Sequence, residues 1–109
     1  MKIMAIIGGR VSERSSWHFL TNHSHTLLSI SDDPDITVRE LARRVGITER
    51  AVMRIIGELD DAGIIERTRE GRRNHYTIHA DRQLRHPVES HCTVGDLIGM
   101  FRRTLTDAS

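Results

Sequence analysis

A local concentration of arginine gives this chain residues that could bind phosphate groups or guanine bases. Between residues 43 and 54 the sequence places four arginines, Arg43, Arg44, Arg50 and Arg54, against one acidic residue, Glu49. The local charge is therefore +3, in a chain whose net charge is only +1. Guanidinium groups bond phosphate oxygens and the major-groove edge of guanine. Charge alone does not decide between nucleic-acid binding and a merely solvated surface.

Two short helices are predicted to position these arginines. Thr37 and Glu40 fit a capping box at the start of a helix over residues 38–45. Gly46 ends that helix, because glycine enters the left-handed conformation without a Cβ penalty. Thr48 can cap a second helix only two residues later. The pattern is that of a helix-turn-helix, in which the second helix enters the DNA major groove.

The second helix, expected over residues 48–62, has two distinct faces. Its apolar residues recur every three or four positions, which predicts packing on a core: Val52, Ile55, Ile56 and Leu59. Its other face, near the start, presents Thr48, Glu49, Arg50, Met53 and Arg54. Arginines at the end that a helix-turn-helix exposes favour DNA binding. The alternative is a corner between two helices that never touches nucleic acid.

A β-hairpin is predicted directly after the second helix. Residues 64–69 and 74–79 alternate as two strands, with Gly71 at the bend between them. A hairpin this short needs a partner to be stable, so we expect Tyr76 and Ile78 to face the second helix. Four arginines gather around the tip: Arg67, Arg69, Arg72 and Arg73. Such a basic tip can lie along the DNA backbone or enter the minor groove.

Over residues 22–78 the sequence resembles winged helix-turn-helix transcriptional regulators of the ArsR and MarR kind. The matching segments are TVRELARRVGITERAVMRIIGELDDAGII and the following REGRRNHYTI. The resemblance implies a mainly α fold, with a three-helix core and a small β-hairpin wing, and a homodimer that binds double-stranded operator DNA. The implied DNA-binding residues are Thr48, Glu49, Arg50, Met53 and Arg54 on the recognition helix and Arg72 and Arg73 on the wing. We add Arg43, Arg44 and Arg69, which lie beside them in the sequence.

The chain divides into an N-terminal arm (1–16), a winged domain (17–80) and a C-terminal part (81–109). The arm is expected to be a short strand or a flexible tether. Thr93 and Asp96 form a second capping box, which begins an amphipathic C-terminal helix. A complete winged domain leaves this helix little to pack on within its own chain, so we predict a dimerisation helix; the alternative is that it folds back on its own domain. The candidate dimer-interface residues are Trp17, Val94, Leu97, Ile98, Phe101 and Leu105.

The sequence gives little support for an enzyme, a metal site or a cofactor site. We predict no enzyme, because no nucleophile, paired carboxylates or metal framework occurs at a meaningful spacing. Seven histidines and one cysteine, Cys92, lack the spacing of a metal site, and VRELARR lacks the paired cysteines of many ArsR-like metal sensors. We therefore predict neither metal nor cofactor. The remaining alternatives are a winged protein-interaction module without DNA binding and a metal- or ligand-responsive sensor of the same fold; no effector is identified.

A cytoplasmic location is expected. A single cysteine excludes an intrachain disulfide and suits a reducing compartment. The first residues, MKIMAIIGG, lack the apolar core and cleavage site of a signal peptide, and no stretch reaches the length of a membrane span.

Overall fold

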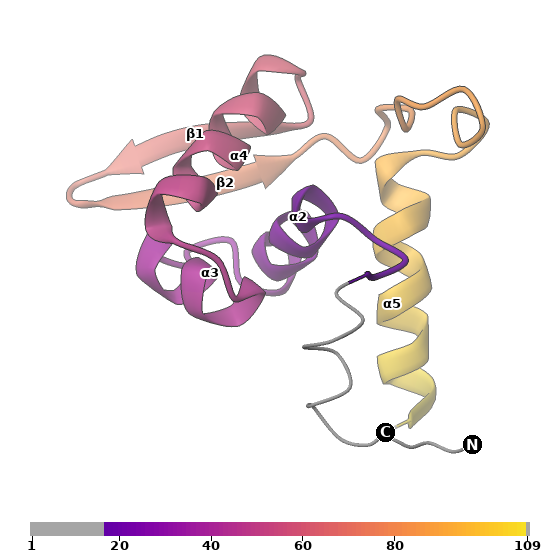
Figure 1. The fold of residues 1–109 in the computed structure, drawn as a ribbon, viewed down its shortest axis with the longest axis horizontal. Helices are drawn as coiled ribbons and strands as arrows, with labels where there is room; N and C mark the ends of the chain where they lie inside the picture. The colour runs from indigo at the N-terminus through magenta and orange to yellow at the C-terminus, as the bar shows by residue number, and fades with distance from the viewer. Residues whose placement is uncertain (1–16, 109) are drawn as a thin grey trace.

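The computed structural model describes residues 17–108, with side chains up to residue 102. The expectations for the arm (1–16) and for the Leu105 side chain lie outside the described part. Figure 1 shows helices grouped beside a two-stranded hairpin that projects to one side, with a last helix standing on the other side. The elements are α2 (Asn22–Asp32), α3 (Val38–Val45), α4 (Glu49–Asp61), β1 (Ile65–Glu70), β2 (Arg73–Ile78) and α5 (Val94–Ala108). Within the described part, no helix is long and apolar enough to span a bilayer.

Threonines cap the N-termini of α2, α3 and α4, where each hydroxyl accepts a hydrogen bond from the backbone N–H three residues later. The distances are 3.3 Å at Thr21, 3.1 Å at Thr37 and 3.0 Å at Thr48. At the start of α5 the capping box is complete. The Thr93 N–H donates to the Asp96 carboxylate at 2.9 Å, and the Asp96 N–H donates to the Thr93 hydroxyl at 3.1 Å. These local bonds fix where the helices begin.

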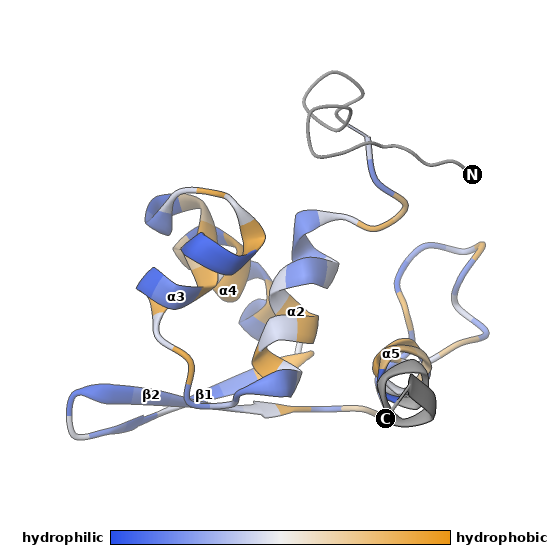
Figure 2. Cartoon of the chain, turned by 90° about the horizontal axis from the view of Figure 1, so that it is seen from below, coloured by the Kyte–Doolittle hydropathy of each residue, from blue (hydrophilic) through white to orange (hydrophobic). Residues whose placement is uncertain are grey.

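The core lies between the helices and the base of the hairpin. α3 packs against both α2 and α4, and α4 also contacts β1. The predicted apolar stripe of α4 is buried, and Tyr76 of β2 is only 2% exposed. By contrast, hydrophilic residues dominate the projecting end of the hairpin (Figure 2). The buried apolar residues are Leu27, Ile30, Ile36, Leu41, Val52, Ile55, Ile56, Leu59, Ile64, Ile65, Tyr76 and Val94.

The first turns of α5 pack on their own domain, so the expectation that this helix has little to pack on is wrong there. Val94, predicted as a dimer contact, is 1% exposed and belongs to the core, and Leu97 and Ile98 pack against it. The segment before α5 causes this placement. The Val94 N–H donates to the Arg82 carbonyl at 2.8 Å, and the Gly95 N–H donates to the Ala80 carbonyl at 2.9 Å. These bonds hold the start of α5 against the end of the hairpin.

Substituting Gly46 tests whether the turn between α3 and α4 requires a left-handed backbone conformation. Its φ is +83°, and a Cβ there would meet no atom within 4 Å. We expect Gly46→Ala to lower the free energy of unfolding by about 1–2 kcal/mol, from left-handed strain alone. Gly57 in α4 also faces open space but has a helical backbone. Gly57→Ala should therefore raise the free energy of unfolding, by about 0.5–1 kcal/mol. Urea denaturation measures both, and equal destabilisation by the two variants would contradict this account.

Candidate nucleic-acid interface

The turn between α3 and α4 presents the start of α4 to solvent. The Ala42 carbonyl accepts hydrogen bonds from the N–H groups of Gly46 at 2.8 Å and Ile47 at 3.1 Å, which closes α3 within two residues. Thr48, Glu49 and Arg50 follow at once and are exposed. A helix N-terminus carries N–H groups without intrahelical partners and a partial positive charge. The exposed start of α4 therefore suits contact with an anionic ligand.

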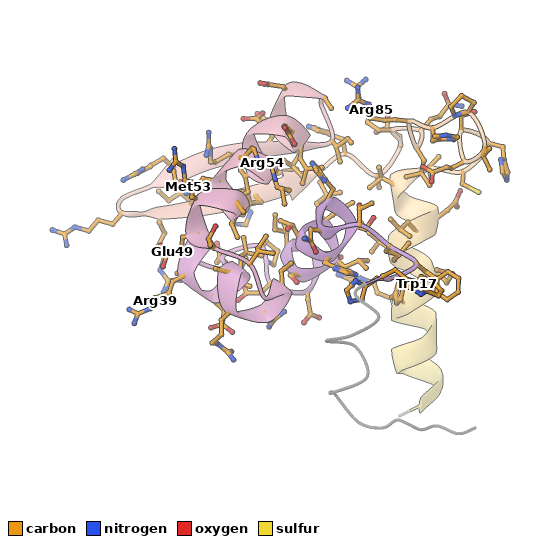
Figure 3. All side chains as sticks on the ribbon, in the orientation of Figure 1. Trp17, Arg39, Glu49, Met53, Arg54 and Arg85 are labelled. Atoms are coloured by element: carbon orange, nitrogen blue, oxygen red, sulfur yellow. The ribbon has the colours of Figure 1, made fainter. Side chains whose placement is uncertain are left out.

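The outward side chains of α4 lie on two flanks. Figure 3 shows Glu49 and Met53 on the side from which the hairpin projects, with Arg54 on another flank. Met53 is 59% exposed. An apolar side chain in this position could contact the methyl group of thymine, as apolar residues do in major-groove complexes. The exposed surface of α4 thus carries both a cationic side chain, Arg54, and an apolar side chain, Met53.

The predicted arginines differ in how firmly they are already paired. Arg43 and Arg44 both contact the Glu40 carboxylate, and Arg44 also lies 3.3 Å from Asp32 of α2. The hydrogen bond from Arg43 lowers the pKa of Glu40 against the opposing effect of desolvation, and the charges of both arginines lower it further. Arg43 and Arg44 must give up these pairs to reach phosphate. Arg50, in contrast, makes no ion pair with any residue that the structure describes.

The hairpin separates its charges between two faces. Arg67 is paired across the sheet with Tyr76, and Arg69 is paired with Asn74. Because side chains alternate along a strand, Arg67 and Arg69 share the face of the buried Tyr76, which is turned toward the helices. Glu66 and Glu70 lie on the opposite face. The face of β1 that carries Arg67 and Arg69 is therefore the face turned toward the helices, which include α4.

This register changes the list of hairpin candidates. Arg67 becomes a candidate together with Arg69, although Arg67 was absent from the predicted DNA-binding residues. Counting the alternation of side chains back from Tyr76, through the turn and along the first strand, would have identified Arg67. Arg72 is exposed in the turn. Arg73 is paired with Glu70, so it lies on the opposite face from Arg67 and Arg69.

Arg39 is a further candidate that the sequence analysis missed. It lies in the first turn of α3, is exposed, and points out on the same side of the molecule as Glu49 and Met53 (Figure 3). An arginine at a helix N-terminus is unfavourable for the helix dipole. Arg39 and Arg50 both occupy the second position of their helices, so this signal in the sequence marks Arg39 as well as Arg50.

The turn before α3 fixes the base of the hairpin. The Tyr76 N–H donates to the Pro34 carbonyl at 3.0 Å, and the His75 Nδ1 lies 2.7 Å from the Asp35 carboxylate. On the other strand, Glu66 lies 3.5 Å from the His79 ring. The contacts of Tyr76 and His75 tie β2 to the segment that leads into α3. In the described residues, no three His, Cys, Asp or Glu side chains are grouped to hold a metal ion.

The His75–Asp35 pair predicts a measurable pH dependence. The hydrogen bond to Asp35 raises the pKa of His75 above its ordinary value of 6.5; desolvation opposes the shift, and the charges of Asp35 and Glu70 add to it. A raised pKa means that the pair stabilises the fold fully below the ordinary value. That contribution is lost as the pH rises through the raised pKa. An NMR titration of the imidazole should show the shift, and Asp35→Asn should abolish most of it; an unchanged pKa in that variant would contradict the assignment.

Known proteins share this arrangement. The family model for winged helix-turn-helix DNA-binding domains matches residues 22–66. A predicted DNA-binding transcriptional regulator from E. coli is similar in structure, with a TM-score of 0.54 and 19% identity over 87% of this chain and 94% of that one. A MarR family protein of Mycobacterium tuberculosis, solved with salicylic acid, has a TM-score of 0.52 and 21% identity over 91% of this chain and 65% of its own length. These matches confirm the predicted fold, a winged helix-turn-helix.

One relative is an enzyme. A riboflavin kinase of Thermococcus kodakarensis is 46% identical over 43 residues, which are 39% of this chain and 20% of the kinase. The chain thus matches about a fifth of that enzyme's length.

Proposed function

We propose that this chain, which has the winged helix-turn-helix fold of MarR-like regulators, is a sequence-specific regulator of transcription that binds double-stranded DNA as a homodimer in the cytoplasm. One observation carries the proposal: Met53, near the exposed start of α4, lies on the side from which the hairpin projects (Figure 3), and Arg67 and Arg69 lie on the hairpin face that is turned toward the helices. A groove-reading helix and a backbone-contacting wing need this arrangement.

In this proposal, α4 and the wing contact different parts of the DNA. α4 enters the major groove, where Arg50 bonds guanine and Met53 contacts thymine methyl groups. The wing lies along the backbone or in the minor groove, where Arg67, Arg69 and Arg72 contact phosphates. Phosphate contacts set the position of the protein, and base contacts give the sequence preference. A bound dimer then acts by occupying the promoter.

Dimerisation uses the apolar residues that the fold leaves exposed. Trp17 is 67% exposed, Phe19 is 92% exposed and Phe101 on α5 is 39% exposed. Trp17 and Phe19 contact each other edge to face, with ring centroids 5.2 Å apart. Exposed aromatic residues of this size suit burial against a second copy. Sedimentation velocity should give the mass of two chains, whereas a single-chain mass at all concentrations would contradict the dimer.

Binding to labelled duplex DNA across a series of salt concentrations tests the proposed function. The affinity should fall linearly on a log–log plot, with a slope of about −0.9 for each phosphate contacted, because counterions are released. A duplex selected from a random library should bind more tightly than its scrambled version. If no duplex binds at low salt, the DNA proposal fails, and a protein-interaction module is the better account of the fold.

A further inference from the structure

The Glu58 carboxylate on α4 is shared by two partners from different helices. The His23 Nε2 of α2 lies 2.6 Å from the Glu58 Oε1. The Arg54 Nη1 donates to both Glu58 oxygens, at 3.4 and 3.5 Å. All three side chains are 40–60% exposed, so they can exchange partners without unfolding the domain. A residue assigned to DNA contact is therefore held by an acidic neighbour.

The ion pair with Glu58 holds the Arg54 side chain away from the end of α4 that would enter the DNA groove. Side chains on a helix lean toward its N-terminus, so an unpaired Arg54 would extend toward Thr48, the end that enters the groove. Glu58 lies one turn further toward the C-terminus, and the pair holds the guanidinium there. An arginine that precedes its glutamate by four residues is also the weaker order for such a pair. Modest competition is then enough to release Arg54.

His23 is the competitor for the same carboxylate. Its contact with Glu58 is shorter than either contact of Arg54. The hydrogen bond from His23 is also the largest cause of the lowered pKa of Glu58, ahead of the opposing desolvation and the charge of Arg54. His23 therefore makes the closer contact with the Oε1 atom that Arg54 also contacts. The other charged or titratable groups that line the cleft beside His23 are Glu58 and Asp61 of α4 and Arg85, His86 and Glu89 of the loop before α5.

We propose that Glu58 is a positioning residue that withholds Arg54 from DNA, and that His23 releases Arg54 by taking over the Glu58 carboxylate. The inference rests on the proposed DNA-binding function and adds its regulation. When the Glu58 carboxylate is bonded to His23, Arg54 can turn toward the N-terminal end of α4. Arg54 then supplies an additional phosphate contact.

A double-mutant cycle separates this arrangement from a simple change of net charge. Glu58→Gln should bind a labelled duplex about two- to fivefold more tightly than wild type, the range expected for a surface ion pair. Asp61→Asn is the matched control, because it removes the same charge from an exposed position on the same helix. Asp61→Asn should have a smaller effect than Glu58→Gln. In an Arg54→Ala background, Glu58→Gln should act no more strongly than Asp61→Asn.

A His23 variant provides a second measurement. His23→Ala should weaken binding of the labelled duplex, because Glu58 then holds Arg54 without a competitor. If Glu58→Gln has the same effect with and without Arg54, the inference is overturned while the DNA-binding function stands. If the wild-type protein binds no duplex, both are overturned.

Discussion

Replacing Leu41 with alanine is expected to lower the free energy of unfolding by about 2–5 kcal/mol, because it leaves a cavity in a packed core. Leu41 is 0% exposed and lies on α3, which packs against both α2 and α4. It is therefore at the centre of the three-helix core. Small domains are stable by only about 5–15 kcal/mol, so this loss is a large part of the total.

Urea denaturation followed by circular dichroism measures the effect of Leu41→Ala. Val88→Ala is the control, because Val88 is 76% exposed in the loop before α5. The control should change the free energy of unfolding by no more than about 0.5 kcal/mol. Equal, small effects of the two variants would show that α3 does not hold the core together.

Replacing Arg50 with alanine is expected to abolish most of the preference for a selected duplex over its scrambled version. One bidentate contact to guanine contributes about 1–3 kcal/mol of discrimination. Arg50 is exposed at the start of α4 and has no ion pair to give up among the described residues, so its guanidinium is available to a base. Binding to the scrambled duplex should weaken much less, because that binding depends on phosphate contacts.

Arg85→Ala provides the matched control for Arg50→Ala. It removes the same charge from the loop before α5, away from Glu49 and Met53 (Figure 3). Fluorescence anisotropy with both duplexes should show preserved discrimination in Arg85→Ala. If both variants lose affinity equally on both duplexes, α4 does not read bases.

The sequence predicted the parts of the fold that local signals determine. Thr37 and Thr48 cap the helices where their spacing placed them, and Gly46 adopts the left-handed conformation that ends α3. The stripe on α4 is buried because its period of three to four residues matches one face of a helix. Each of these features depends on residues within a few positions of one another.

Features that depend on distant contacts were missed or misjudged. The packing of Val94 follows from backbone bonds to Ala80 and Arg82, which the periodicity of α5 does not reveal. Likewise, the competition of His23 and Arg54 for Glu58 joins residues that are 35 positions apart in the sequence. A count of charges in the sequence does not distinguish one arginine from another. In the structure, Arg44 and Arg54 form ion pairs, whereas Arg50 is exposed and forms none with the described residues.

Mapping the duplex on the protein by NMR tests directly whether α4 and the wing form the DNA-binding surface. Backbone amide shifts of labelled protein would be followed during titration with the selected duplex at low salt. We predict that the largest changes occur at Arg39, at the start of α4 (residues 48–54) and on the wing (residues 67–73). Changes confined to the cleft between α2 and the loop before α5, or no changes at any residue, would contradict the assignment of α4 and the wing as the DNA-binding surface.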